Sequence, residues 1–491
     1  GGRILRPSAM QLAWRAFGRR KMAICASSPP HSHHHNTCNF SSAPHGPSLS
    51  ATNSFTLLHP PCTVARCPVG VPRATAVRTS IIRQSVSSAR FMRDTTAVAG
   101  IRQFSSLQNK AGKLFVSGWS NCGALGLGKD MVKAKQPTEI PLQEPVIDVS
   151  CGKKFTVFVT ASGKVYSMGD NNYGELGNPS AGKAAFEPIL AQGLDGIKMV
   201  KIAAGQHHVL ALSDIGEVYS WGWGGSGTPG AGVGALGHGD KSSQPAPKRI
   251  ESLNGEKITN ISCGAKHSVA LSQDGTMFTW GHGEQGRLGH GNNTDFLQPE
   301  PISDSPKMKW IECGEHFTAA IGLDGTLYTW GKNKVGELGL EGMSVFAQES
   351  SPTSLDRDEC FKGASVIHIG CGHQHCVAVT EDAVVYVWGA AGFSYHTPHR
   401  LNLISAPSDP SHRIKQVFAG NSYSAAITEE GKVCTWGRNK VMMEGFAFVG
   451  TNHVLGHPTT SSWLVEPTTV ESLSNVKSVA CGNLHTAFIA G

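Results

Sequence analysis

The chain has 491 residues, with 43 Lys and Arg against 36 Asp and Glu, so its net charge is +7 with histidine neutral. Glycine is frequent, at 58 residues, and charged residues make up only 16%. This composition is typical of a turn-rich β protein and excludes a coiled coil or a charged helical bundle. No run of 18 apolar residues occurs, so no membrane-spanning helix is expected.

The N-terminal segment differs in charge from the rest of the chain. Residues 1–93 contain 12 basic side chains, 11 of them Arg, and the first carboxylate is Asp94. Such Arg-rich, Ser-rich and acid-free sequence is typical of an organellar transit peptide. Arg102 precedes Phe104 and Ser105 as in sites cut by the mitochondrial processing peptidase. We therefore expect residues 1–104 to be a disordered mitochondrial transit peptide and the mature protein to lie in the matrix. A basic tail that grips DNA or chromatin is the alternative, but GRRK at 18–21 is its one cluster.

The remaining 398 residues carry 31 basic against 36 acidic side chains and are mildly acidic. Affinity for nucleic acid comes mainly from Lys and Arg, so direct RNA or DNA binding is not expected.

A repeated phrase begins at residue 146, in sequences such as VIDVSCG, ITNISCG and MKWIECG. A turn glycine follows most of these phrases after 11 residues, and a second phrase such as YSWG or FTWG ends 17 residues after the first. The landmark glycines that close the first phrase are Gly152, Gly205, Gly264, Gly314, Gly372, Gly420 and Gly482. Apolar and polar residues alternate between the two phrases around Asp-Gly reversals, which is a β-hairpin signal. With one strand before and one after, each unit predicts a four-stranded propeller blade.

The seventh unit is split between the two ends of the propeller region. Gly482 opens a copy whose second half is found instead at AGKLFVSG, where Gly112 and Gly118 keep the six-residue interval of Gly163 and Gly169. The sequence therefore predicts an all-β, seven-bladed propeller over residues 105–491, closed by N- and C-terminal strands that share one blade. Closure removes the two open sheet edges of a linear array.

Side chains at fixed repeat positions fit this geometry. Alanine recurs six residues after the landmark glycine, where seven converging sheets leave little room. Tryptophan precedes the second glycine in five copies and is expected to wedge between blades. Cysteine precedes the landmark glycine in five copies and is interpreted as a small buried residue.

The phrases CGxxHxxAL, G-x-[VL]-[YF]-T-W-G and GELG or GRLG resemble the repeats of the regulator-of-chromosome-condensation family. The resemblance covers about residues 112–491 and all seven blades. It implies the propeller fold but is weaker for function, because family members serve nucleotide exchange on small GTPases, chromatin docking, ubiquitin ligases, ultraviolet reception and organelle biogenesis. The sequence contains no Ser-His-Asp order, paired-carboxylate motif, Walker motif or zinc signature, so no chemical active site is expected.

Two repeat positions carry candidate partner-binding residues. In the family's exchange factor for a nuclear GTPase, histidines three residues after the landmark glycine and acids three residues after the second glycine face the partner. The resemblance therefore implies a ring at the propeller mouth formed by His208, His267, His375 and His485, together with Asn121, Asn172 and Glu284. Because one acid alone is kept at the second position, the nuclear GTPase is not the expected partner. The alternative is that the histidines are hydrogen-bonding residues of the repeat.

Two insertions interrupt the repeat. Residues 222–239 include Gly232, Gly234 and Gly237 in a GxGxxG pattern, but no helix is expected to follow, so a nucleotide loop is disfavoured. The second insertion contains four apolar residues that are either a partner anchor or tucked under the blade: Met442, Met443, Phe446 and Phe448.

Metal ligation is not expected. The His31–His35 tract and Cys62 with Cys67 lack a second ligand pair at zinc spacing. In CGHQHC, alternation along a strand predicts that Cys371 and Cys376 point to opposite faces.

The expected function is thus a non-enzymatic protein-interaction propeller in mitochondria, without cofactor or metal, that acts as exchange factor or regulator of an organellar GTPase. A scaffold for mitochondrial ribosome or RNA assembly is the alternative, and a nuclear chromatin-bound exchange factor is less favoured. GWRHT-like photoreceptor repeats are absent from the sequence, and a ligase domain is not expected beyond the closing strand.

Overall fold

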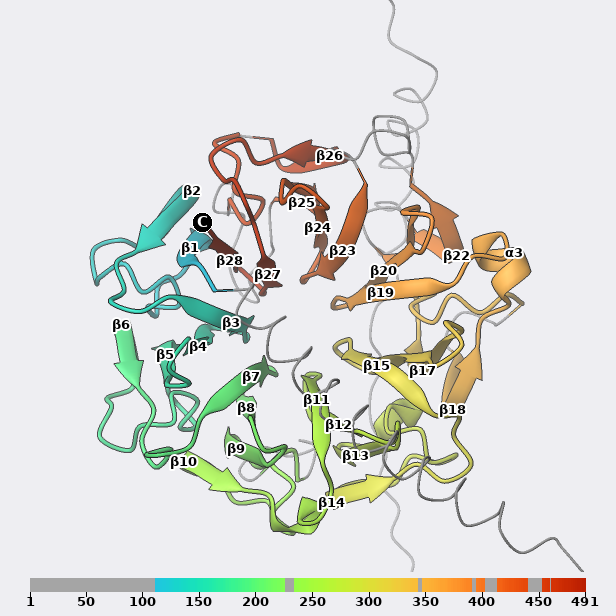
Figure 1. Ribbon diagram of the computed structural model, residues 1–491, viewed down its shortest axis with the longest axis horizontal. Helices are drawn as coiled ribbons and strands as arrows, with labels where there is room; N and C mark the ends of the chain where they lie inside the picture. The colour runs from blue at the N-terminus through green and yellow to red at the C-terminus, as the bar shows by residue number, and fades with distance from the viewer. Residues whose placement is uncertain are drawn as a thin grey trace, which may run out of the picture. The chain divides into compact units, whose positions relative to one another are not determined.

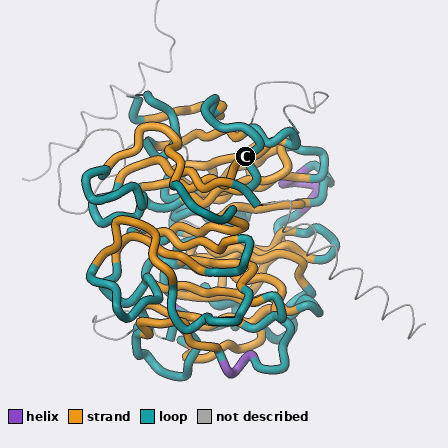
Figure 2. Tube along the Cα trace, turned by 60° about the vertical axis from the view of Figure 1, so that its left-hand side comes forward, coloured by secondary structure: helices purple, strands orange, loops and turns teal. Residues whose placement is uncertain are grey.

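The protein is described by a computed structural model over residues 111–225, 234–342, 347–390, 394–401, 413–439, 453–459 and 461–491. Seven four-stranded antiparallel sheets stand around one axis, as Figure 1 shows. Strands and loops make up nearly all of the described chain, and helix is confined to short segments (Figure 2). The predicted seven-bladed propeller is confirmed.

Each blade repeats the same four strands from the axis outward. The innermost strands are β3 (Val146–Cys151), β7 (Met199–Ala204), β11 (Ile258–Cys263), β15 (Met308–Cys313), β19 (Val366–Cys371), β23 (Ile414–Ala419) and β27 (Ser478–Cys481). The second strands are β4 (Phe155–Thr160), β8 (His208–Ser213), β12 (His267–Ser272), β16 (Phe317–Gly322), β20 (His375–Thr380), β24 (Tyr423–Thr428) and β28 (His485–Ala490).

The outer half of each blade is formed by the strand that carries the second glycine and by one edge strand. The third strands are β1 (Lys113–Trp119), β5 (Val165–Asp170), β9 (Val218–Gly222), β13 (Met277–Gly281), β17 (Leu327–Asn333), β21 (Val385–Ala390) and β25 (Val433–Arg438). The edge strands are β2 (Lys133–Ile140), β6 (Ala184–Leu190), β10 (Gln244–Arg249), β14 (Phe296–Pro301), β18 (Ala347–Ser354), β22 (Ser394–Arg400) and β26 (Trp463–Thr469). In the described part of the chain, short helices lie between strands at η1 (Glu251–Leu253), η2 (Glu284–Gly286) and α3 (Arg357–Phe361).

The closing blade joins distant parts of the sequence. Its strand order is β2-β1-β28-β27, and β1 pairs with β28 from Lys113 opposite Ala490 to Gly118 opposite His485. The shared blade predicted from the split repeat is therefore confirmed.

The repeated tryptophans lie between blades, as the sequence predicts. Trp221 and Trp280 are fully buried, and their indole N–H groups donate to the backbone oxygens of Glu175 and Ala235 in the preceding blade, at 2.9 and 3.0 Å. The repeated alanines are fully buried as well, at Ala211, Ala270, Ala320, Ala378 and Ala426.

At each landmark glycine from Gly152 to Gly420, the ring of the residue three positions later leaves no room for a side chain. A Cβ added at Gly314 would overlap the Phe317 ring, and one added at Gly205 would overlap the His208 ring. Overpacking of this kind costs about 1 to 3 kcal/mol. We expect Gly314→Ala to lower the free energy of unfolding by that amount in denaturant titrations. Gly182→Ala is the matched control, because a Cβ there meets open space; equal stability of the two variants would contradict the overlap.

Candidate protein-interaction site

The turns after the innermost strands gather around the axis on one side of the propeller, here called the mouth face. In each blade, the residue after the second glycine donates its backbone N–H to the carbonyl two residues after the landmark glycine, at 2.7 to 3.1 Å. These donor and acceptor pairs are Trp119 and Leu484, Asp170 and Lys154, Trp223 and His207, His282 and Lys266, Lys332 and His316, Ala390 and Gln374, and Arg438 and Ser422. The mouth face is thus a ring of seven similar positions with different side chains. The opposite side, made by the hairpin turns between second and third strands and by the links to the next blade, is called the far face.

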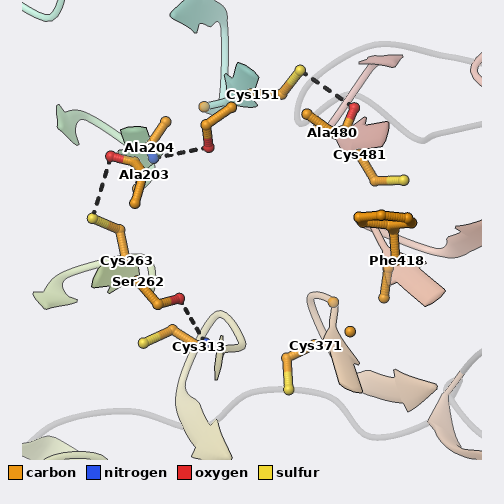
Figure 3. Close-up of a pocket in the computed structure, with 18 of the residues that line it drawn as sticks. Cys151, Ala203, Ala204, Ser262, Cys263, Cys313, Cys371, Phe418, Ala480 and Cys481 are labelled. Carbon is orange, nitrogen blue, oxygen red and sulfur yellow. Dashed lines mark hydrogen bonds between the residues drawn. The ribbon is translucent and has the colours of Figure 1, made fainter. Parts of the chain in front are cut away.

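A central cavity of about 1130 Å³ is lined by the innermost strands and by mouth-face turns. Five cysteines line its wall with Phe418 (Figure 3): Cys151, Cys263, Cys313, Cys371 and Cys481. Burial raises the pKa of the Cys151 thiol to about 12 and raises the pKa of Cys263 well above its usual value. Thiols held in the protonated form are poor nucleophiles, so this ring is structural.

One sequence expectation about these cysteines is wrong. Cys371 and Cys376 do not diverge: they are direct cross-strand partners of β19 and β20, and their Sγ atoms lie 3.8 Å apart. The tight turn reverses the chain between them, and partners opposite each other in a hairpin share a face. Among the described residues, no group of three or more His, Cys, Asp and Glu side chains is arranged to hold a metal ion.

Polar side chains of the cavity wall satisfy the free edges of the innermost strands. Asp148 accepts from the Ile202 N–H at 2.9 Å, and Ser150 accepts from the Ala204 N–H at 3.0 Å. The cavity lining also includes Lys201, whose Nζ lies 4.9 Å from the centroid of the Trp310 ring. Burial raises the pKa of the Glu312 carboxyl to about 7, although the nearby Lys201 lowers it.

The four predicted histidines are inside the stack of blades and not on the mouth surface. Their side chains are 0 or 1% exposed. Each Nε2 lies 2.8 to 3.0 Å from a hydroxyl of the next blade, pairing His208 with Ser268, His267 with Thr318, His375 with Ser424, and His485 with Thr156. The expectation of an exposed histidine ring is therefore corrected, and the burial favours the alternative interpretation, hydrogen-bonding residues of the repeat.

Burial also fixes the charge state of these rings. Ser268 donates its hydroxyl hydrogen to the Ala235 carbonyl at 2.8 Å, so it accepts from the Nε2–H of His208. The Nδ1 atoms of His208, His267 and His375 are buried and lack a hydrogen-bond partner. Desolvation lowers the pKa of His208, His375 and His485 to about 4. The rings are therefore neutral at pH 7.

The other described candidates do lie on the mouth face. Asn121 is exposed and lines the cavity entrance. Asn172 is exposed and donates to the Asp170 carboxylate at 2.7 Å. Glu284 has a side chain 62% exposed and pairs with His282 at 3.0 Å. A further set of candidates lies outside the described residues, namely Met442, Met443, Phe446 and Phe448.

Partly exposed mouth-face residues that the sequence reasoning missed include a second set of histidines. His207, His316 and His373 occupy the first or second place after the landmark glycine, and His282 follows a second glycine. His207 pairs with Glu175 at 3.0 Å, and Tyr173 packs edge-on against the His207 ring at a centroid distance of 5.2 Å. Tyr173 is 38% exposed, so it offers an aromatic anchor to a partner.

The glycine-rich insertion does not form a dinucleotide loop in its described part. Residues 234–243 are turns and bends that lead into β10, without the helix that would meet a phosphate. The flanks of the insertion meet, because the Gly234 N–H donates to the Gly224 carbonyl at 3.0 Å. None of the helices in the described residues has the length and apolar character that crossing a membrane requires.

The chain is similar to several known proteins. The E3 ubiquitin-protein ligase HERC2 of Mus musculus is 31% identical over 389 residues, which are 76% of this chain and 8% of HERC2. The Ultraviolet-B receptor UVR8 of Arabidopsis thaliana is 31% identical over 341 residues, 68% of this chain and 72% of UVR8. The chain thus spans a small part of HERC2 and most of the length of UVR8.

Two solved structures support the fold alone, since their identities are low. Human WBSCR16 has a TM-score of 0.65 and 21% identity, covering 77% of this chain and 100% of that chain. Prp20p from Saccharomyces cerevisiae has a TM-score of 0.66 and 22% identity, covering 78% and 92%. The sequence profile of the RCC1-like domain matches residues 230–491, and that of the Regulator of chromosome condensation (RCC1) repeat matches residues 111–159 and 162–212. With its seven confirmed blades, the chain belongs to the regulator-of-chromosome-condensation repeat family.

Proposed function

We propose that the chain is a non-enzymatic protein-interaction propeller of mitochondria that acts as a guanine-nucleotide exchange factor for an organellar GTPase, held at the mouth face. The carrying observation is the ring of seven mouth-face positions, which share one backbone arrangement and differ in side chain. A rigid scaffold with variable surface positions suits recognition of one protein partner. Support for a GTPase comes from Prp20p, whose structure is described together with its binding to Gsp1p and histones.

The exposed aromatic at Tyr173 is the proposed anchor. Its ring packs against His207 and lies 6.3 Å from the Trp223 ring, so truncation removes contact area without opening the core. Loss of an interface anchor costs about 1 to 2 kcal/mol or more. We expect the full chain to speed release of a fluorescent nucleotide from GTPases captured in isolated mitochondria, and Tyr173→Ala to lower that rate roughly tenfold.

Ile215→Ala is the matched control, because Ile215 is 67% exposed in the hairpin turn between β8 and β9, on the far face. Capture without faster release would identify an adaptor in place of an exchange factor. Equal loss in both variants would place the contact elsewhere.

The mitochondrial part of the proposal depends on the N-terminal segment, which lies outside the described residues. Its composition and the Arg102, Phe104 and Ser105 context support cleavage near Phe104. Sequencing the N-terminus of the protein purified from mitochondria should find a mature chain that starts at or next to Ser105. A nuclear protein that keeps its basic tail would contradict import and favour chromatin binding.

A further inference from the structure

The two faces of the propeller differ in how their charged side chains are paired. On the far face, acids in the hairpin turns pair with bases from neighbouring links, as Asp274 does with Lys307 at 2.7 Å and Glu429 with Arg413 at 3.3 Å. A third such pair joins Asp324 and Arg357 at 3.5 Å. Several charges on the far face are therefore neutralised in pairs.

Several acidic side chains of the mouth face form hydrogen bonds or ion pairs with other residues of the chain. Glu175 is fully buried, where it accepts from the Tyr173 N–H at 2.8 Å and contacts His207. Glu315, with a side chain 13% exposed, accepts from Gln206 at 2.6 Å and pairs with His373.

Two further acids of this face are engaged as well. Asp170 is 9% exposed. Asp295 accepts from the Gly283 N–H at 2.6 Å and from His282 at 2.9 Å. The loops between the third strands and the edge strands also carry exposed acids, namely Asp130, Asp240, Glu284 and Glu341, and none of these four lines the central cavity.

Mouth-face cations, by contrast, have their charges available. Lys154 and Arg438 are exposed, and Lys153 and Lys266 are partly exposed. Within the described part of the chain, no carboxylate forms a salt bridge with any of these four. Lys266 lies over the Trp223 ring at 5.9 Å and Arg438 over the Trp463 ring at 5.8 Å, so both cations are held by aromatic faces.

Lys266 lies in the mouth-face turn between β11 and β12, and the other three cations lie at the central cavity. Lys153, Lys154 and Arg438 line it, at blades on either side of the closing blade. From this arrangement we infer that the mouth face binds an acidic peptide segment of its protein partner, whose carboxylates meet these four cations, three of them at the cavity entrance. This inference builds on the proposed use of the mouth face and adds the chemistry of the partner.

The arrangement of the cations favours a peptide over a nucleic acid. Four separate cations on one face match a few carboxylates, whereas a nucleic-acid strand needs a continuous basic groove that follows its backbone. The chain after residue 93 carries more acidic than basic side chains, so it would repel an extended polyanion that reached past these cations.

The test uses the full chain and a fluorescein-labelled peptide of alternating Glu and Asp, with binding followed by fluorescence anisotropy at low salt. We expect saturable binding that weakens as salt is added, and no binding of a Lys peptide of equal length. Lys154→Gln with Lys266→Gln should weaken binding about tenfold, which equals about 1.4 kcal/mol. The control is Lys257→Gln with Lys362→Gln, two exposed lysines of far-face links, and it should stay within about twofold of the parent.

Equal weakening in both double variants would mean that net charge alone acts, and would overturn the inference. A labelled uridine oligonucleotide that bound more tightly than the acidic peptide would assign the face to nucleic acid and overturn it too. The peptide assay contains no GTPase, so a failed nucleotide-release assay with retained peptide binding would contradict the exchange function and leave the acidic partner standing.

Discussion

Deleting residues 476–491 should yield a protein that aggregates, or that unfolds far below the temperature of the full chain. This deletion removes β27 and β28, leaves β1 paired with β2 alone, and exposes the edge of β1 that pairs with β28. Five large buried side chains leave the core with it: Val476, Val479, Leu484, Phe488 and Ile489. At about 1.5 to 3 kcal/mol each, their burial is comparable with the whole stability of a domain. Deleting residues 105–119, which removes β1, should have an equal effect.

The measurements are light scattering and thermal unfolding followed by circular dichroism. Removal of residues 226–233 is the control, because their flanking residues already meet in the Gly234 to Gly224 hydrogen bond and no described strand is lost. We expect its melting temperature to stay within a few degrees of the parent. An end-truncated chain that remained monomeric and cooperative would show that closure is not needed.

Acid should destabilise the propeller through its buried histidines. The folded pKa of His208 is about 4, below the value of about 6.5 for an unfolded chain. Between these values the unfolded state binds a proton that the folded state does not, so stability is full above pH 6.5 and falls as the pH drops toward 4. Each such histidine should cost about 2 kcal/mol between pH 7 and pH 5. Urea titrations at both pH values measure the loss.

Another blade of the propeller suggests a variant that tests whether His208 takes up the proton. Phe155, at the same repeat position as His208, packs with Val209 of the next blade, whereas His208 meets Ser268. His208→Phe with Ser268→Val should therefore keep most of the stability at pH 7. The Ala235 carbonyl, which loses the Ser268 hydroxyl, still accepts from Trp280.

We expect the stability lost by this double variant between pH 7 and pH 5 to be about 2 kcal/mol smaller than in the parent. His396→Phe, at an exposed site on β22, is the control and should leave the loss unchanged. A double variant as acid-sensitive as the parent would show that His208 is not the group that takes up the proton.

The repeat predicted the fold because spacing reports backbone geometry directly. Gly314 and Gly331 keep their interval of 17 residues, since one hairpin with β15 beside it has a fixed length in every blade. The blade shared by β1 and β28 was predicted from the same fixed spacing, because the missing half of the last repeat was present at Gly112 and Gly118.

The site was harder to predict because recurrence marks packing, not contact with a partner. The third place after the landmark glycine holds only rings, and its partner in the next blade changes with it: Phe317 packs with Cys376, whereas His375 meets Ser424. That pairing was present in the sequence and was the signal that could have identified the histidines as internal. The first two places vary from Lys153 and Lys154 to Glu315 and His316, which is typical of a solvent-facing loop. Which of these charges are free depends on contacts between blades, and spacing carries no information about them.

The pairing of β1 with β28 also constrains how the protein is made. Strand β1 is among the first of the propeller to leave the ribosome, and its partner leaves 367 residues later, as the positions of Gly118 and His485 in the register show. At 5 to 20 residues per second, β1 waits for roughly 20 to 70 seconds with an unpaired edge. A chain that crosses a membrane before folding would meet the same delay again on the other side. We expect chaperones that shield this strand to raise the yield, and slower synthesis, which lengthens the wait, to lower it without altering the finished fold.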